Sequence, residues 1–216
     1  MVRPFLASIR RRPPRRLMLE RLPDNMAVIV VSDRELHAKI VYYGPGLSGK
    51  TTNLDWIYKH LPMADRSDLV SIDTEHERTL FFDFLPIDIN KVGDYQLRLH
   101  MYTVPGQERF AATRSAILRG VDGVVFVADS QRDRVSENQK SLEELTAHLA
   151  KHGRSLSDVP VVFQYNKMDL TTALTKAQLD AYHNPNGVPS VMASAITGQG
   201  VVETLGDIVR GVVRKF

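Results

Sequence analysis

A glycine-rich stretch at residues 44–51 constrains the fold more than any other part of this chain. It reads G-P-G-L-S-G-K-T and has the form G-x-x-x-x-G-K-T of a phosphate-binding loop. The apolar, β-branched and aromatic run at 38–43 predicts a strand before it, and residues 51–61 place apolar side chains on one helical face after it. Strand, loop and helix are the context that this motif requires, so the chain is predicted to bind nucleotide phosphates.

The residue types in this loop suit a dense anion. Glycines let backbone N–H groups approach phosphate closely, and the helix N-terminus adds unpaired N–H groups and a positive dipole end. We expect Lys50 to reach the β- and γ-phosphates and the Thr51 hydroxyl to ligate Mg²⁺. The expected nucleotide-binding residues here are Gly44, Gly46, Leu47, Ser48, Gly49, Lys50, Thr51 and Thr52. The alternative is a glycine-rich turn that binds nothing, and the loop alone does not choose between ATP and GTP.

The composition is that of one globular domain. The chain has 216 residues, of which 43% are hydrophobic and 25% charged, and no apolar run reaches the ~18 residues of a membrane span. It has no cysteine, which excludes disulfides, thiolate metal sites and prenyl or palmitoyl anchors. The absence of cysteine also fits a reducing compartment, so we expect a cytoplasmic protein.

The positive charge is concentrated at the N-terminus. Residues 1–25 hold seven arginines, and without this segment 21 basic and 23 acidic side chains remain, a net charge of −2. We therefore expect no nucleic-acid partner for the body. Residues 1–25 are predicted to form a disordered Arg/Pro-rich arm and residues 26–216 the folded domain. The arm is either a solvated tail, or a segment that is not native, with Met26 as the true start, or a transit peptide or electrostatic contact with an anionic membrane.

Strand and helix patterns alternate along the rest of the chain. We expect strands at 27–31, 38–43, 79–85, 96–103, 123–129, 161–165 and 190–193, and helices at 51–61, 109–119, 136–152, 176–182 and 201–214. The first two strands form a hairpin, residues 62–78 form a long loop over the phosphate site, and 90–94 turn. The pattern predicts an α/β fold, with a mostly parallel six-stranded sheet, helices on both faces and an added N-terminal hairpin strand.

The segment Asn166-Lys167-Met168-Asp169 follows directly after a predicted buried strand and has the N-K-x-D form that reads guanine. Asp169 would accept hydrogen bonds from the guanine N1–H and exocyclic amine, which adenine does not offer. We expect Lys167 to lie along the base plane and Asn166 to tie this loop to the phosphate loop. Ser194-Ala195-Ile196 fits a loop whose backbone reaches the guanine O6. A lone N-K-x-D would be a surface turn, but this combination favours guanine binding over a kinase or ATPase.

The segment Thr103-Val104-Pro105-Gly106-Gln107 resembles the D-x-x-G-Q motif of Ras-like small GTPases, with Thr103 in place of the usual aspartate. Together with residues 41–54, 78–86 and 122–130, it is similar to the prokaryotic MglA family, the small GTPases of gliding motility and cell polarity. The resemblance covers about residues 34–214. Because a neutral hydroxyl would hold Mg²⁺ only weakly and through water, Thr103 leaves open a GTP-dependent scaffold with negligible turnover.

The resemblance implies the Ras-like version of the P-loop NTPase fold and a molecular switch that uses GTP, GDP and Mg²⁺. It implies that Thr79 ligates Mg²⁺ beside Thr51, that Gly106 belongs to the γ-phosphate sensor, and that hydrolysis is slow without a partner. The catalytic residues would be Gln107, Arg78 and Lys50. Gln107 would orient the attacking water, and Arg78 would act as an arginine finger supplied by the same chain. Otherwise, Arg78 is a solvated loop charge and Gln107 a turn residue.

The same resemblance implies a Roadblock-fold activating partner, an MglB-like protein and a dimer, and action at the cell pole or membrane surface. The aromatic residues Phe81, Phe82 and Phe84 are expected to serve the core and a partner surface. The seven histidines show no metal-ligand spacing, so we expect none of them to bind a metal.

Overall fold

The computed structural model of this protein describes residues 28–30, 35–61, 70–71, 83–92, 95–106 and 110–215. The predicted arm at 1–25 lies outside the described residues, and so do Arg78, Thr79, Phe81, Phe82 and Gln107. The predictions made for these residues therefore stay predictions.

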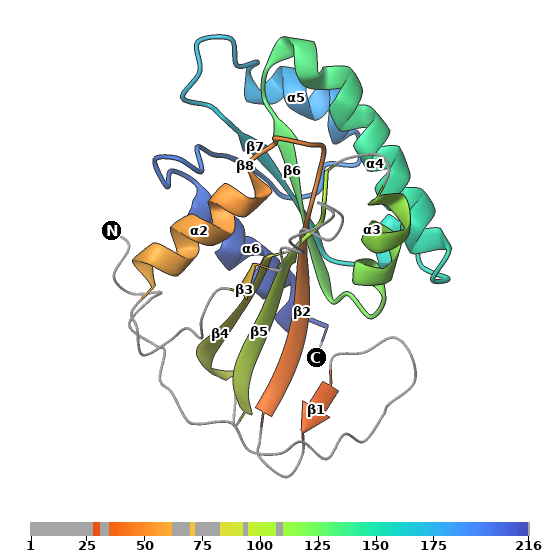
Figure 1. Ribbon diagram of the computed structural model, residues 1–216, viewed down its shortest axis with the longest axis vertical. Coiled ribbons are helices and arrows are strands. Elements are labelled where there is room, and N and C mark those ends of the chain that lie inside the picture. The colour runs from red at the N-terminus through yellow and green to blue at the C-terminus, as the bar shows by residue number, and fades with distance from the viewer. Residues whose placement is uncertain are drawn as a thin grey trace, which may run out of the picture.

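A single mixed sheet forms the centre of the molecule (Figure 1). Its strands are β1 Val28–Val30, β2 Glu35–Tyr43, β3 Val70–Ser71, β4 Asp83–Val92, β5 Tyr95–Thr103, β6 Gly123–Asp129, β7 Val161–Asn166 and β8 Ser190–Met192. Their order is β3-β4-β5-β2-β6-β7-β8, and β1 pairs with β2. The pairs within β5-β2-β6-β7-β8 are parallel, whereas β1, β3 and β4 pair antiparallel with their partners.

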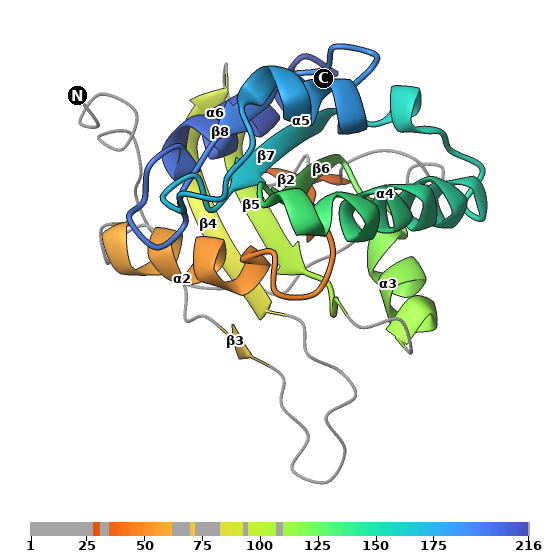
Figure 2. The same ribbon diagram turned by 90° about the horizontal axis from the view of Figure 1, so that it is seen from above.

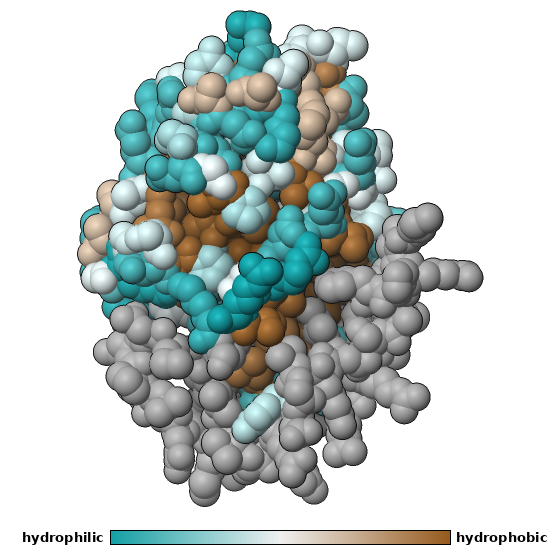
Figure 3. Space-filling model, turned by 180° about the vertical axis from the view of Figure 1, so that it is seen from behind, coloured by the Kyte–Doolittle hydropathy of each residue, from teal (hydrophilic) through white to brown (hydrophobic). Residues whose placement is uncertain are grey.

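Helices cover both faces of the sheet, as Figure 2 shows from above. They are α2 Lys50–His60, α3 Ala111–Leu118, α4 Val135–Ala150, α5 Lys176–His183 and α6 Val201–Val213, with short 3₁₀ turns η3 Arg132–Arg134 and η4 Leu156–Asp158. Helices α2 and α6 lie on one face, and α3, α4 and α5 lie on the other. Seen from the side of α6, hydrophobic residues gather in the middle of the surface, bordered by hydrophilic ones (Figure 3).

The two faces of the sheet carry separate hydrophobic cores because successive strand residues point to opposite sides. On β2, Ile40 and Tyr42 pack under α2 and α6, whereas Val41 and Tyr43 pack under α3 and α4. All seven residues of β6 are buried, as expected of a strand covered on both faces. The predicted α/β fold with its mostly parallel sheet and its hairpin strand is confirmed.

Two local predictions are wrong. We expected a strand to end at Leu85 and a turn to begin at Asn90, but β4 continues to Val92 with a register shift after Ile89. Pro86 is tolerated on β4 because β3 pairs with Asp83 and Phe84, so among the described residues no strand pairs with the outer side of β4 at Pro86. The expected loop at 62–78 also contains a two-residue strand, β3, which adds to that edge.

Candidate nucleotide site

The phosphate loop joins β2 to α2 between the carboxyl ends of neighbouring parallel strands, where ligands bind in open α/β sheets. Gly44 and Gly49 have φ values of 147° and 99°, which favour glycine. A Cβ at Gly44 would lie 2.2 Å from the carbonyl oxygen of Val127, and one at Gly49 would lie 2.2 Å from the side-chain nitrogen of Asn166. Both glycines are therefore required for the loop to close against the ends of β6 and β7.

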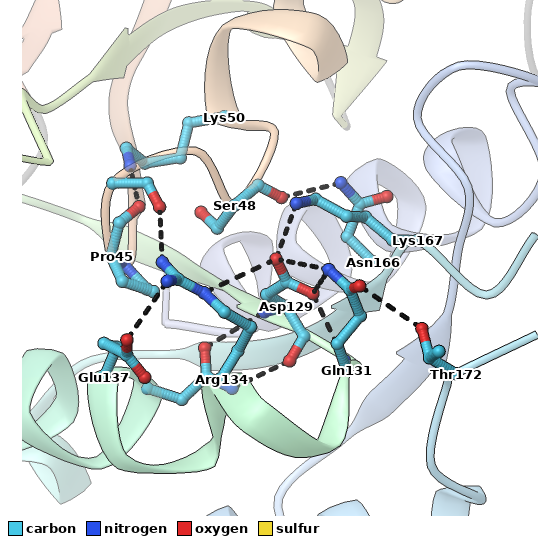
Figure 4. Close-up of polar contacts among 12 residues, drawn as sticks. Pro45, Ser48, Lys50, Asp129, Gln131, Arg134, Glu137, Asn166, Lys167 and Thr172 are labelled. Carbon is cyan, nitrogen blue, oxygen red and sulfur yellow. Dashed lines mark hydrogen bonds and ion pairs between the residues drawn. The ribbon is translucent and has the colours of Figure 1, made fainter. Parts of the chain in front are cut away.

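Lys50 begins α2 and turns its side chain back into the loop (Figure 4). Its Nζ donates to the carbonyl oxygens of Gly44, at 2.9 Å, and Pro45, at 2.6 Å, and the residue is only 6% exposed. Burial and, to a lesser extent, the charge of Arg114 lower the pKa of Lys50, the charge of Asp83 opposes both, and the result is a pKa of about 7. The site therefore holds a cation that gains from an anionic partner such as phosphate.

Asn166 joins the three nucleotide loops. It lies at the end of β7, where its Nδ2 donates to the Ser48 carbonyl oxygen at 2.7 Å and its Oδ1 accepts from the Ala195 N–H at 2.8 Å. Asp169 is exposed at the same edge, and Ile196 is 76% exposed. The structure thus joins two of the predicted base-binding segments, at Asn166 and at Ala195, to the phosphate loop.

The ammonium of Lys167 contacts a residue that the sequence analysis did not single out. Its Nζ lies 2.5 Å from Oδ2 of Asp129, at the end of β6 (Figure 4). Asp129 is 1% exposed, so the acidic partner of this ion pair is buried. Its sequence signal is an aspartate at the carboxyl end of a fully buried strand.

Asp83 is a second residue that the sequence analysis missed. It opens β4 opposite Thr103, the residue that stands where Ras-like sequences have aspartate. The Asp83 N–H donates to the Thr103 hydroxyl at 2.8 Å, and that hydroxyl donates to the Asp83 carboxylate at 2.9 Å. A carboxylate is thus present beside Thr103, supplied by the neighbouring strand. Its sequence signal is a lone charge in the apolar run Phe81-Phe82-Asp83-Phe84.

A cavity of about 380 Å³ opens between the phosphate loop and the segment after β5. Its lining includes Lys50, Thr51, Thr103 and Gly106. Hydroxyl and carboxylate oxygens are the donors that Mg²⁺ prefers, and Mg²⁺ keeps several waters and takes phosphate oxygens as ligands. The Thr51 and Thr103 side chains supply hydroxyl oxygens to this cavity, which suits Mg²⁺ bound together with a nucleotide. Within the described ranges, no group of three or more His, Asp or Glu side chains could hold a metal by itself.

A cavity of about 620 Å³ lies between the phosphate loop, Gly106 and the helices α3 and α4. Arg114 of α3, 2% exposed, donates to the Pro105 carbonyl oxygen at 3.2 Å and to the Glu144 carboxylate of α4 at 2.9 Å. A Cβ at Gly106 would lie 2.4 Å from the Gly46 Cα. The segment 105–106 is therefore in contact with both the phosphate loop and α3.

Sequence comparisons identify the family. The sequence model of the ADP-ribosylation factor family matches residues 25–212. The mutual gliding-motility protein MglA of Myxococcus xanthus (strain DK1622) is 48% identical over 191 residues, which are 88% of this chain and 98% of that protein. The chain belongs to the MglA-type small GTPases.

More distant relatives place this MglA-type GTPase among the Ras-like proteins. The Ras-related protein Rab-21 of Geodia cydonium is 27% identical over 82% of this chain and 71% of its own length. The ADP-ribosylation factor-like protein 6 of Caenorhabditis briggsae is 28% identical over 78% of this chain and 83% of its own length. The chain therefore binds GTP and GDP and hydrolyses GTP, and the kinase and ATPase alternatives fall away.

The described part of this MglA-type GTPase contains no helix with both the length and the apolar character needed to cross a membrane.

Proposed function

We propose that this GTPase is a nucleotide-controlled switch in cell polarity or gliding motility, and that a Roadblock-type partner stimulates its turnover. The observation that carries the proposal is the contact of Asn166 with both the phosphate loop and the segment at Ala195. It joins a base-reading loop and a phosphate loop into one site, beside the segment 105–106 that leads to α3. The 48% identity to a gliding-motility protein supports the process.

Base recognition is assigned to the loops after β7 and β8. Asp169 accepts hydrogen bonds from the guanine N1–H and exocyclic amine, Lys167 lies along the base, and the backbone at Ser194-Ala195-Ile196 reaches O6. Adenine would leave the Asp169 carboxylate without its donors, so ATP is rejected. The exposed position of Asp169 at the nucleotide edge supports this role.

Phosphate and metal binding are assigned to the phosphate loop, with Lys50 on the β- and γ-phosphates and Thr51 and Thr79 as hydroxyl ligands of Mg²⁺. When bound, Mg²⁺ neutralises charge on the β- and γ-phosphates. We assign to Asp83 the role of the missing aspartate. Its carboxylate holds the Thr103 hydroxyl, and its charge acts on Lys50, which lines the same cavity as Thr103. Its carboxylate would help to hold Mg²⁺ through hydrogen bonds to water, which a threonine alone would orient poorly.

Hydrolysis is assigned to Gln107, which orients the attacking water, and Arg78, which stabilises charge on the transferred phosphoryl group. Support comes from Gly106, whose backbone lies against Gly46 of the phosphate loop. A γ-phosphate at this loop would press on Gly106 directly. The contact of Pro105 with Arg114 then carries such a movement to α3 and α4.

The partner surface is assigned to the switch segments and to the side of β4 and β5 that carries Phe84 and Tyr102. Phe84 faces this side, with its ring centre 4.8 Å from that of Tyr102 and 5.8 Å from that of His100. Phe84 is half-buried and is not among the residues of either core. A Roadblock-fold dimer docking here would meet both an aromatic surface and the nucleotide-sensing segments.

The test is GTP turnover by the purified GTPase with and without a Roadblock-type dimer. We expect turnover on the order of 10⁻⁴ s⁻¹ alone, as in the known Ras case, and stimulation by the partner. Arg78→Ala and Gln107→Leu should lose the stimulation and keep GTP binding, whereas Arg214→Ala, at the exposed end of α6, should behave as the native protein. Stimulation of either active-site variant to the native level would remove that residue from the mechanism.

A GTP-dependent scaffold with negligible turnover is the second candidate, favoured by Thr103 in place of aspartate. Partner binding that requires GTP, without any stimulated hydrolysis, would select it. A partner that binds the GDP and GTP forms equally would contradict both candidates, because neither would then act through the nucleotide state.

A further inference from the structure

Two non-glycine residues in the described part of the chain have positive φ, and both lie in the nucleotide loops. Leu47 of the phosphate loop has φ 63°, and Lys167 of the base loop has φ 68°. Such conformations cost free energy for residues with a Cβ and persist only where their surroundings hold them. What holds these two residues therefore decides whether the site is formed.

Asp129 contacts Lys167 directly (Figure 4), and Arg134 contacts Gly46, the residue before Leu47. The Asp129 carboxylate takes the Lys167 ammonium at 2.5 Å. Arg134 donates from Nη2 to the Gly46 carbonyl oxygen at 3.3 Å, which belongs to the peptide bond that enters Leu47. The Nε of Arg134 lies 3.9 Å from Oδ2 of Asp129, the oxygen that Lys167 also contacts.

Asp129 and Arg134 are themselves held by regular structure rather than by a loop. The Asp129 N–H donates to Asn138 Oδ1 at 3.0 Å, and Asn138 Nδ2 donates to the Asp129 carbonyl oxygen at 2.8 Å. Asn138 lies on α4 and is fully buried. Arg134 also donates to Glu137, on the first turn of α4, at 3.0 Å. The end of β6 and the start of α4 thus form a fixed support between the two loops.

The far side of the base loop is tied to the same support. Gln131 donates from its side chain to Asp129 at 3.2 Å and accepts from the Thr172 hydroxyl at 3.2 Å. The Leu174 N–H donates to the Ser130 carbonyl oxygen at 2.8 Å. The segment 129–134 therefore spans from the phosphate loop to the residues that follow Asp169.

We propose that Asp129 and Arg134 are positioning residues that hold both nucleotide loops in their binding geometry and couple guanine recognition to the grip on the phosphates. The proposal rests on the base-reading role given to Asp169 above. The coupling arises because Lys167 and Arg134 share one buried carboxylate oxygen. If either cation is lost, the negative charge of the buried Asp129 carboxylate is less well neutralised. The contact of Asp129 with the other cation, and the position of the loop that this contact holds, then change as well.

The test compares affinities for GDP and inosine diphosphate, which lacks the exocyclic amine that Asp169 reads. For Arg134→Ala and Asp129→Asn we expect GDP affinity to fall about tenfold, since strain at one loop is no longer opposed. We also expect the ratio of GDP to inosine diphosphate affinity to fall about fivefold, a modest coupling between sites. The matched control is Arg132→Ala, an exposed arginine two residues away, which should leave both affinities unchanged.

Two further variants separate positioning from folding. Arg134→Lys keeps the charge but cannot reach three partners with a planar fork, so it should resemble Arg134→Ala while its melting temperature stays native. Leu47→Gly removes the cost of positive φ, so it should reduce the penalty that Arg134→Ala imposes on GDP binding.

Equal losses of GDP and inosine diphosphate affinity in Arg134→Ala would overturn the coupling and leave a local support of the phosphate loop. Native GDP affinity in Asp129→Asn, or a full Arg134→Ala penalty in the Leu47→Gly background, would also contradict the proposal. Failure of the proposed function looks different, because the native protein would then fail to prefer GDP over ADP.

Discussion

The Thr103 hydroxyl donates to the Asp83 carboxylate at 2.9 Å and accepts from the Asp83 N–H at 2.8 Å. Both residues are buried, with exposures of 2% and 8%. The antiparallel register of β4 and β5, with Phe84 opposite Tyr102, brings the two residues together. A carboxylate therefore lies beside Thr103, supplied by the neighbouring strand.

The contact between Asp83 and Thr103 predicts what happens when the carboxylate is transferred from position 83 to position 103. Asp83→Asn should raise the Mg²⁺ concentration needed to slow GDP release, because the amide accepts weaker hydrogen bonds from metal-bound water. Thr103→Asp alone places two carboxylates in contact and should also weaken binding. The double variant Asp83→Asn with Thr103→Asp should recover most of the native behaviour.

The measurement is the GDP release rate across a Mg²⁺ titration. Asp88→Asn is the matched control, since Asp88 lies on the same strand but pairs with Arg98 at 2.6 Å. If Asp83→Asn and Asp88→Asn respond to Mg²⁺ alike, Asp83 has no part in the metal site.

Lys50 predicts a pH dependence of stability in the nucleotide-free protein. Its folded pKa of about 7 lies below the ordinary value of 10.5. Between these two pH values the unfolded chain holds a proton that the folded chain has lost, so stability should rise with pH across this window. Lys50→Met should remove this rise and stabilise the protein at pH 7, with about 2–4 °C in melting temperature for each kcal/mol gained.

Melting temperatures of both proteins from neutral to alkaline pH give the comparison, because the other titrating groups are common to both. A native protein that is most stable relative to Lys50→Met at pH 7 would contradict the predicted sign. Lys50→Met should also lose nucleotide binding, since a methyl thioether cannot pair with phosphate.

Gly123 lies so close to α6 that a larger side chain at this position should strain the packing between β6 and α6. A Cβ there would lie 2.7 Å from Val212 and 3.0 Å from Ile208, both on α6. Gly123→Ala should therefore destabilise the fold by about 1–3 kcal/mol through overpacking, as measured by denaturant unfolding. Gly206→Ala on α6 is the control, because its nearest contact is the flexible end of Arg210 at 3.2 Å and alanine favours helix. Equal destabilisation by both variants would argue against overpacking under α6.

We expect residues 1–25 to affect membrane contact but not folding or nucleotide binding. A protein that starts at Met26 should bind and hydrolyse GTP as the full chain does. The seven arginines at 1–25 would matter only at an anionic surface, with about 1 kcal/mol for each arginine near the membrane. Sedimentation of both proteins with anionic vesicles at low and high salt measures this contact, which salt should screen. Loss of GTP binding on truncation would show that the arm belongs to the fold.

The sequence predicted what depends on local pattern and spacing. The phosphate loop, the N-K-x-D segment and every described helix lie where the pattern indicated, within about two residues, because their signals are periodic or chemically specific. Asp83 and Asp129 were missed because their meaning depends on register and neighbours. Asp83 appears as one residue of an apolar strand until β5 brings Thr103 to it. In the sequence, Arg134 is one charge in a polar segment, and only the structure shows that its guanidinium donates to the Gly46 carbonyl oxygen.

Competition for bound fluorescent GDP measures the guanine selectivity of this GTPase. GDP and GTP should displace the label at concentrations far below those of ADP and ATP, because Asp169 is left unpaired beside adenine. Asp169→Asn should shift the preference toward xanthine nucleotides, whose second carbonyl accepts a hydrogen bond from the new amide. If ATP displaced the label from the native protein as effectively as GTP, guanine recognition by Asp169 would be ruled out.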